Sequence, residues 1–201
     1  MDDWVLKALQ RWPNVPALFG WLGLDRRGRW LIQGETISHA RIVETINRNY
    51  GVDAHGRWYF QNGPQRGYIQ LASTPLILFV AEDQSGLITH NQLPVTRVDD
   101  AHLDEEGALV LLTEHGAGEL IGSDLPWALE RMSSHNRAID DDTLSAALAL
   151  PSGSQTNITL SFASTTLPLR RLDFADMPAT LAFERQPTPR EGEKTATKAM
   201  D

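Results

Sequence analysis

A single well-marked amphipathic helix, set between short strand-like runs, constrains the fold of this chain more than any other feature. Residues 37–51 place Ile42, Val43, Ile46 and Tyr50 at spacings that align on one face of a helix. A helix of this length is stable only when its apolar face packs on another element. The neighbouring runs have the pattern of strands, so we expect an α+β protein in which helices pack on sheets.

The ends of this helix carry their own signals. Ser38 is a suitable N-cap, because its hydroxyl can accept a hydrogen bond from a free backbone N–H of the first turn. Ile37 and Ile42 have the spacing of a hydrophobic staple, and Gly51 is placed to end the helix in a left-handed conformation. These signals predict a helix that starts after Ser38 and buries Ile42 with the rest of its apolar face.

Short strand-like segments flank the helix. Turn residues separate them, including Asn62-Gly63, a dipeptide typical of hairpins. Between residues 21 and 80 the pattern therefore predicts a hairpin, the helix, a second hairpin and a further strand. The predicted strands cover residues 19–24, 29–33, 57–61, 67–71 and 76–80.

A fainter copy of the same order follows. Two strands are predicted at residues 108–112 and 119–121, with a turn at 116–118, and Ser123 or Asp124 then caps a helix through Met132. Repeated units of this kind bury their apolar faces together. Further on, Asp140, Asp141 or Asp142 can cap a short helix over residues 143–150, and residues 157–162 and 167–172 alternate like strands.

The repeat suggests how the chain divides. We expect a helical lead over residues 1–19, a first hairpin-helix-hairpin unit over 20–92 and a second, divergent unit over 93–184. Each unit is expected to be a strongly bent antiparallel sheet packed on a helix. Residues 185–201 have no periodicity and are rich in polar residues, so they are predicted to form a mobile tail.

Composition excludes several classes of protein. The chain of 201 residues has no cysteine, which removes disulfides, thiolate nucleophiles and cysteine-ligated metals. No apolar run reaches the ~20 residues that cross a bilayer. The first residues are acidic where a secretory signal would be basic, so a cytoplasmic protein without membrane contact is expected.

Charge is unevenly distributed along the chain. Residues 1–71 carry nine Lys or Arg against six Asp or Glu, whereas residues 72–142 carry three against fourteen. Because phosphate backbones need clustered positive charge, the net charge of −8 argues against nucleic-acid binding. A small anionic ligand near the basic first third is compatible with this pattern. The alternative is that the acidic middle is a solvated face.

No motif indicates a metal, a cofactor or a catalytic residue. The six histidines are dispersed and lack the spacing that puts two imidazoles on one metal. The acidic run at residues 99–106 lacks the spacing of a calcium loop and is expected to be a solvated loop. We find no nucleophile elbow, and the glycines at 116, 118 and 122 lack the context of a phosphate loop.

One polar constellation remains as a candidate ligand site. It combines amides and two guanidinium groups from the end of the helix and from the following hairpin loop, which converge if the strand from Arg57 folds back beside the helix. In the alternative interpretation these residues serve only turn formation and surface solvation. The candidate residues are Asn47, Arg48, Asn49, Asn62, Gln65 and Arg66.

The segments 28–39, 46–50 and 56–66 resemble a family of uncharacterised bacterial proteins known only as a domain of unknown function. The order of aromatic strands around a capped helix is also similar to a second bacterial family. That family is built from repeated hairpin-helix units and has a suggested signalling role. The resemblance implies the repeat and a bacterial cytoplasmic setting, and it supplies no catalytic residues.

Together these features favour a non-catalytic binding or signalling module for a protein partner or a small anionic ligand. The alternative is a hydrolase-type enzyme that uses His39 or His55 with an acidic residue of the second unit. A cleft lined by titratable groups would favour the enzyme, and an amide-rich or apolar surface would favour the binding module.

Overall fold

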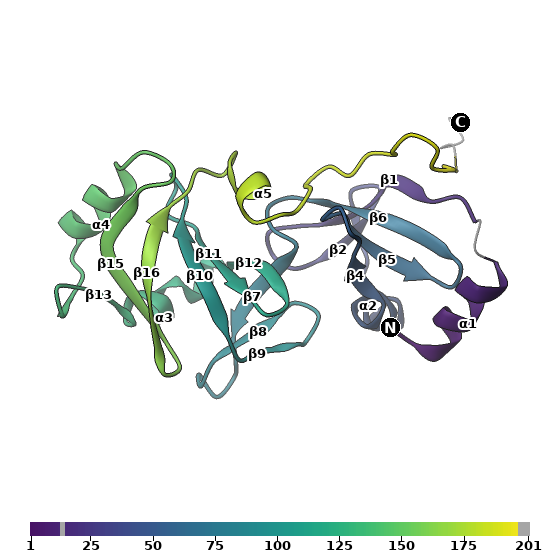
Figure 1. The fold of residues 1–201 in the computed structure, drawn as a ribbon. Helices are drawn as coiled ribbons and strands as arrows, with labels where there is room; N and C mark the ends of the chain where they lie inside the picture. The colour runs from purple at the N-terminus through teal and green to yellow at the C-terminus, as the bar shows by residue number, and fades with distance from the viewer. Residues whose placement is uncertain (13–14, 197–201) are drawn as a thin grey trace. The chain divides into compact units, whose positions relative to one another are not determined.

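The computed structural model describes residues 1–12 and 15–196, which form two units (Figure 1). The first unit contains residues 1–72 together with the chain from Ala182 onward, and the second contains Ser73–Leu181. Each unit has its own sheet with helices packed beside it. No helix in the described part of the chain has the length and apolar character needed to cross a membrane.

The first unit is built on a six-stranded sheet with the order β3-β2-β1-β6-β5-β4. All its strand pairs are antiparallel except the central pair, in which β1 runs parallel to β6. Its elements are α1 (Asp3–Arg11), β1 (Leu18–Leu24), β2 (Trp30–Ile32), β3 (Glu35–Thr36), α2 (Ala40–Arg48), β4 (Tyr50–Val52), β5 (Trp58–Asn62) and β6 (Gln65–Leu71).

The second unit has a ten-stranded sheet with the order β14-β13-β15-β16-β10-β11-β12-β7-β8-β9. Its strands are β7 (Leu76–Val80), β8 (Leu87–Thr89), β9 (Pro94–Val95), β10 (Val98–Leu103), β11 (Leu109–Thr113), β12 (Gly116–Leu120), β13 (Met132–Ser134), β14 (Arg137–Ala138), β15 (Gln155–Phe162) and β16 (Thr165–Arg171). Its helices are η1 (Gly122–Asp124), α3 (Leu125–Leu129), α4 (Asp141–Leu148) and α5 (Met177–Thr180).

The two units share a core arrangement, which confirms the predicted α+β architecture of related units. In each core, three strands joined by hairpins precede a helix: β1, β2 and β3 precede α2, and β10, β11 and β12 precede α3. Three strands follow α2 and four follow α3, and β7, β8 and β9 extend the second sheet. The first and last strands then pair in parallel at the centre of the sheet, β1 with β6 and β10 with β16. This central pair corrects the expectation of purely antiparallel sheets: the hairpins flank it, and residues distant in sequence form it.

An aspartate turn recurs before corresponding strands of both units. The carboxylates of Asp25, Asp53 and Asp104 each accept hydrogen bonds from the backbone N–H groups two and four residues further on. Glycine follows three positions after each aspartate, and Gly28 and Gly56 have φ of 75° and 77°. Other residues are strained at such angles, so the turn needs glycine there.

Helix α2 forms where it was predicted, but its ends differ. The backbone N–H of Ile37 donates to the carbonyl oxygen of Trp30 at 2.8 Å, which keeps Ile37 in the preceding hairpin. The helix therefore begins at Ala40, with His39 rather than Ser38 at the cap and no side-chain cap bond. Ile42, predicted to be buried, is 49% exposed, whereas Ile46 is 1% exposed and packs in the core.

The end of α2 is also set by the sheet. Gly51, predicted to end the helix in a left-handed conformation, instead lies in β4, where it pairs with Tyr59 of β5. Tyr50 pairs with Phe60 in the same ladder, so the chain enters a strand as soon as it leaves the helix. Strand pairing thus replaces the predicted cap.

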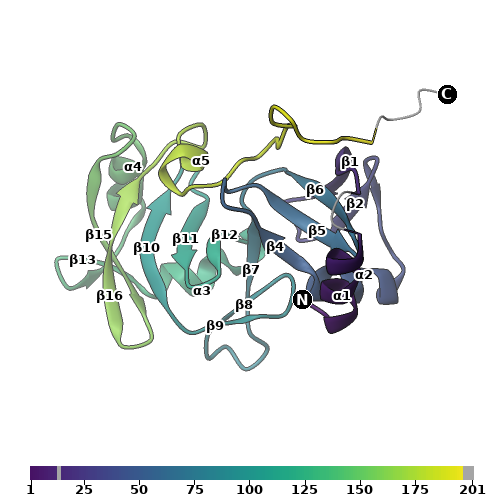
Figure 2. The same cartoon turned by 45° about the vertical axis from the view of Figure 1, so that its right-hand side comes forward.

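The boundary between the units lies earlier than the predicted one at residues 92 and 93. Strand β7 pairs in parallel with β12 and antiparallel with β8, so residues from Ser73 onward belong to the second sheet. The chain also returns to the first unit after Leu181. Its last part, shown in yellow, runs past β6 and β1 in both views (Figures 1 and 2).

This returning segment includes most of the residues that were predicted to form a mobile tail. Leu71 donates its backbone N–H to the Arg185 carbonyl oxygen at 2.9 Å, and Glu184 donates to that of Gly56 at 3.0 Å. Residues 185–196 therefore have a defined path beside the sheet. Residues 197–201 of the predicted tail lie outside the described part of the chain.

In the second unit, the short helix α4 begins at Asp141, earlier than predicted, and its cap is Asp140, one of the three predicted alternatives. The Asp140 carboxylate accepts a hydrogen bond from the backbone N–H of Thr143 at 2.8 Å. The preceding helix is shorter than predicted: α3 ends at Leu129, and Met132 begins a strand that pairs with β15. Residues 116–118, predicted to be a turn, instead form part of β12 because β12 pairs with both β11 and β7.

Candidate functional site

The polar residues at the end of α2 serve the fold of the first unit. The side-chain oxygen Oδ1 of Asn47 accepts a hydrogen bond from the indole N–H of Trp30 at 2.7 Å. Asn49 is fully buried; its Oδ1 accepts from the backbone N–H of Asp2 and its Nδ2 donates to the Asp2 carboxylate, at 2.8 and 3.1 Å. The exposed Arg48 lies 3.4 Å from the same carboxylate. Asn47 therefore joins α2 to β2, and Arg48 and Asn49 join it to the N-terminal residues.

The three candidate residues of the β5–β6 hairpin have different surroundings. Asn62 is exposed at the end of β5. The Gln65 amide donates to the carbonyl oxygen of Pro16 at 3.3 Å, which fixes the chain that precedes β1. Arg66 lines the cavity described next and the other five candidates do not line it, so the structure does not bring all six into one site.

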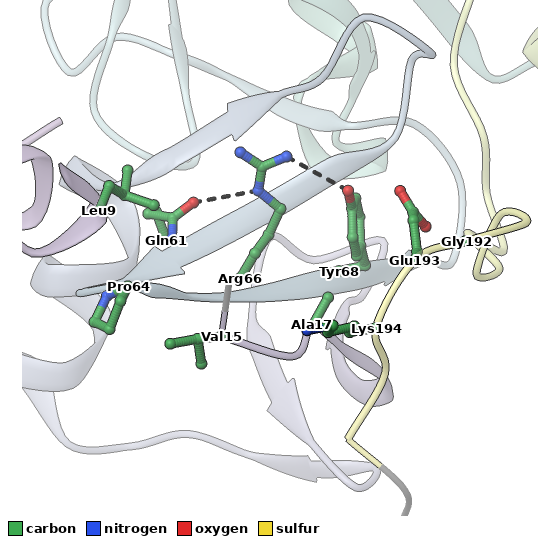
Figure 3. Close-up of a pocket in the computed structure, with 10 residues that line it drawn as sticks. All are labelled: Leu9, Val15, Ala17, Gln61, Pro64, Arg66, Tyr68, Gly192, Glu193 and Lys194. Carbon is green, nitrogen blue, oxygen red and sulfur yellow. Dashed lines mark hydrogen bonds between the residues drawn. The ribbon is translucent and has the colours of Figure 1, made fainter. Parts of the chain in front are cut away.

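This cavity lies in the first unit and has a volume of about 370 Å³ (Figure 3). One side is formed by β5, β6 and the hairpin between them, and the C-terminal segment passes on the other side. Apolar groups from α1 and from the chain before β1 complete the wall. The lining residues are Leu9, Val15, Ala17, Gln61, Pro64, Arg66, Tyr68, Gly192, Glu193 and Lys194.

Arg66 is held in place by uncharged partners. Its Nε donates to the side-chain amide oxygen Oε1 of Gln61 at 3.2 Å, and its Nη1 lies 3.5 Å from the Tyr68 hydroxyl. The guanidinium carbon stands 3.8 Å from the centre of the Tyr59 ring, in a cation–π contact. No carboxylate among the described residues forms an ion pair with Arg66. The cavity wall therefore presents a positioned positive charge without a counterion.

A second guanidinium group, that of Arg57, contacts Tyr68. Arg57 is 2% exposed, and its Nη2 donates to the Tyr68 hydroxyl at 2.9 Å. Its Nε donates to the Asp53 carboxylate at 2.8 Å. Its Nη1 and Nη2 also donate to the two carboxylate oxygens of Glu193, at 2.8 and 2.6 Å. Arg57 is thus shared between a turn of the sheet and the C-terminal segment.

These contacts shift the ionisation of the groups around Arg57. Its hydrogen bonds hold the pKa of Glu193 down, at about 2. Burial alone would raise the pKa of Asp53, but hydrogen bonds from the turn backbone and from Arg57 leave it below its ordinary value. Burial raises the pKa of the Tyr68 hydroxyl. Both carboxylates are therefore ionised at neutral pH and the phenol is protonated.

The charges at this site do not cancel. Arg57, Arg66 and Lys194 oppose Asp53 and Glu193, which leaves one net positive charge in and beneath the cavity. A guanidinium fork binds carboxylate or phosphate through paired hydrogen bonds. The two carboxylates are already bound to Arg57, so neither is a ready proton acceptor. The arrangement is suited to binding an anion.

The sequence contains a repeated motif that points to Arg57. The stretch Asp-x-x-Gly-Arg-Trp occurs twice, and each aspartate pairs with the arginine four residues later, Asp25 with Arg29 and Asp53 with Arg57. Arg29 has a side chain 50% exposed, whereas that of Arg57 is 2% exposed. The difference arises because the C-terminal segment covers Arg57, and no local pattern predicts that contact with Glu193.

The residues of the alternative enzymatic interpretation lie elsewhere. His39 is exposed at the cap of α2, and His55 is exposed in the turn before β5. Neither lines the cavity around Arg66. Within residues 1–12 and 15–196, no group of three or more His, Cys, Asp or Glu side chains is arranged to hold a metal ion.

The profile of a protein family named DUF2944, described as "Protein of unknown function (DUF2946)", matches residues 1–188. The chain belongs to this family. No curated protein matches the chain at a significant level. Two solved structures do, both of DUF1285 family proteins.

The DUF1285 family protein from Silicibacter pomeroyi DSS-3 is 14% identical, with a TM-score of 0.52, and the match covers 85% of this chain and 96% of that one. The DUF1285 family protein from Shewanella baltica OS155 is 17% identical, with a TM-score of 0.40 over 52% of this chain and 86% of that one. The Silicibacter protein therefore shares the fold of this DUF2944 chain. The predicted likeness to an uncharacterised family is confirmed, while the second, signalling family stays a prediction.

Proposed function

We propose that the first unit is a binding module that takes a small anionic ligand, a carboxylate or a phosphate, at Arg66. The observation that carries this proposal is the guanidinium of Arg66, which is positioned at the wall of a cavity and has no carboxylate partner among the described residues. An ion pair between Arg66 and the ligand would supply the missing counterion.

The surroundings of Arg66 support this role. The Tyr59 ring and the Gln61 amide restrict the arginine side chain before any ligand arrives, so binding loses less side-chain entropy than at a free surface arginine. The cavity also has apolar walls from Leu9, Val15 and Pro64, which can contact the carbon skeleton of a ligand.

The proposed role is recognition or signalling without turnover. General acid–base catalysis needs a group that exchanges a proton near neutral pH. The carboxylates of this site, Asp53 and Glu193, are ionised and bound to Arg57, and their pKa values are lowered. The proposal accordingly assigns Arg66 to binding and assigns no residue to catalysis.

The proposal is tested by titration calorimetry with inorganic phosphate, succinate and citrate at low ionic strength. The wild-type chain is compared with Arg66→Gln and with Arg48→Gln, a matched control that removes an exposed arginine of the same unit. A charge-assisted contact contributes about 1.5–3 kcal/mol, so Arg66→Gln should weaken binding more than about tenfold. Arg48→Gln should leave it unchanged. Equal affinity in all three proteins would refute the proposal.

A further inference from the structure

The C-terminal segment occupies the first unit in the way a bound peptide would. Ala17 donates its backbone N–H to the carbonyl oxygen of Lys194 at 2.9 Å, and Ala196 donates to that of Ala17 at 3.0 Å. These bonds make a parallel bridge between Ala17 and Thr195. The bridge lies just before β1, outside the strands of the sheet. Main-chain bonds of this kind, combined with one side chain in a specific contact, resemble the way in which extended peptides add to strands.

The specific contact is the Glu193 side chain. Its two carboxylate oxygens accept hydrogen bonds from Nη1 and Nη2 of Arg57. Its Oε2 also accepts a hydrogen bond from the backbone N–H of Arg190 at 2.9 Å. Residues 188–192 on its N-terminal side are exposed. Arg57 Nη1 also donates to the backbone carbonyl oxygen of Thr188 at 3.1 Å. From residue 188 to residue 196, the segment is therefore anchored mainly by Arg57, which holds one carboxylate and one carbonyl oxygen, and by one backbone bridge. Such a small contact can be exchanged for another of the same kind.

The segment also leaves part of the site unsatisfied. Arg57 and Arg66 both reach the Tyr68 hydroxyl, but Glu193 pairs only with Arg57. The next residue, Lys194, lines the cavity together with Arg66 and carries the same charge. An acidic residue at this position would replace this like charge with an opposite one on the cavity wall, which the segment of this chain does not do.

We infer that the docking slot, defined as Arg57, Arg66 and the backbone of Ala17, binds an extended acidic peptide of a partner protein. The C-terminal segment of this chain occupies the slot until the partner displaces it. The partner places one carboxylate on Arg57 in the position of Glu193 and a second on Arg66, and its backbone replaces the bridge at Ala17. The second contact rests on the proposed anion site at Arg66.

The chemistry of the slot favours this occupant over others. The bridge at Ala17 requires an extended backbone with free N–H and C=O groups, which a polypeptide supplies. Arg57 already binds a glutamate, so its geometry is that of a carboxylate site. With one net positive charge, the slot attracts an acidic segment and repels a basic one.

The test uses the full chain carrying Glu193→Gln, in which the internal occupant is weakened, and three fluorescently labelled peptides. The first peptide has the sequence of residues 186–196, the second carries Glu193→Gln, and the third carries Lys194→Glu. Fluorescence anisotropy should show that the first peptide binds the variant chain at least tenfold more tightly than it binds the wild-type chain. The second peptide should not bind measurably.

The third peptide tests the contact with Arg66. It should bind the Glu193→Gln chain several-fold more tightly than the first peptide, and this gain should vanish in the Glu193→Gln/Arg66→Gln chain. The first peptide should bind both chains equally, because Glu193 pairs with Arg57 alone. If the first peptide binds but small anions do not, the proposed anion site at Arg66 is refuted and the docking slot is supported. If small anions bind but the first peptide does not, the docking slot is refuted.

A second measurement protects the test against a variant that does not fold. The chain contains no cysteine, so Thr195→Cys in the otherwise wild-type protein takes a single nitroxide label at the exposed bridge residue. Excess of the third peptide should convert the label from a restricted to a mobile spectrum, and the second peptide should not. A label that stays restricted at saturating third peptide would overturn the inference, as would failure of the first peptide to bind a folded Glu193→Gln chain.

Discussion

The carboxylate of Glu193 accepts two parallel hydrogen bonds from Arg57, at 2.8 and 2.6 Å, across 136 residues of chain. Paired bonds of this geometry are among the strongest side-chain contacts in proteins. Arg57 is almost fully buried and also holds Asp53 and Tyr68. The contact therefore links the end of the chain to the turn that starts β5.

The two partners of this contact should differ in their effect on stability. Arg57→Ala leaves Asp53 and Glu193 facing each other without a cation, and the loss of a buried partner costs about 3–5 kcal/mol. Glu193→Gln leaves Arg57 bound to Asp53 and Tyr68, so its cost should be about 1 kcal/mol. Urea denaturation of both variants measures the difference. Equal destabilisation by the two substitutions would contradict the assignment of Arg57 as the buried centre.

The docking of the C-terminal segment should depend on pH. The pKa of Glu193 is about 2 in the folded protein against an ordinary value of 4.5, so folding favours the ionised form. The stabilisation by this group is complete above about pH 4.5 and is lost as the pH falls toward about 2. The protection factors of the backbone amides at residues 193–196, which correct hydrogen–deuterium exchange for its intrinsic pH dependence, should therefore fall across this window. The Glu193→Gln chain should show no such transition, and a transition near neutral pH would contradict the prediction.

Two elements that depend on local sequence were predicted correctly in type and place, although the ends of the first differ. Helix α2 and the Asp140 cap of α4 are determined by residues within a few positions of each other, and both form. The parallel pairing of β1 with β6 joins residues more than forty positions apart, and no local pattern distinguishes it from an antiparallel hairpin edge. The return of the chain after Leu181 depends on contacts that are more distant still.

The candidate site was predicted in part for the same reason. Arg66 was identified from residue type and position, and it does line a cavity. The amides of Asn47 and Asn49 were identified by the same reasoning, but they bond to Trp30 and Asp2, which lie elsewhere in the sequence. Residue type indicates what a side chain can bind. Only the three-dimensional arrangement determines which groups remain available for a ligand.

The core role of α2 can be tested with one substitution at two positions of the same helix. Ile46 is 1% exposed and Ile42 is 49% exposed. Ile46→Asp buries an unpaired charge and should destabilise the first unit by more than about 3 kcal/mol, enough to unfold a marginal protein. Ile42→Asp should change stability by less than about 0.5 kcal/mol. Circular dichroism melts compare the two, and a large loss in both would show that Ile42 belongs to the core.

The second unit contains a buried histidine that should make its stability depend on pH. His90 is 8% exposed, and its Nδ1 accepts the backbone N–H of Ile77 at 3.2 Å. Burial lowers the pKa of His90 to about 3, against an ordinary value of 6.5. Below about pH 6.5 the unfolded chain therefore binds a proton at His90 that the folded chain does not.

The second unit should consequently lose stability as the pH falls from about 6.5 toward about 3. One pH unit corresponds to about 1.4 kcal/mol for such a group, so His90 should remove about 2 kcal/mol between pH 6.5 and about pH 5. Burial also lowers the pKa of His102, which adds to the same trend.

His90→Asn keeps an acceptor for Ile77 and should flatten the pH dependence of stability, although the smaller side chain lowers stability at every pH. His135→Asn, at an exposed position of the same unit with φ of 50°, is the matched control and should leave the slope unchanged. Urea unfolding at each pH, monitored by hydrogen exchange in β7, gives the dependence of stability on pH for each protein. Equal dependence in wild type and His90→Asn would show that His90 is not the group responsible.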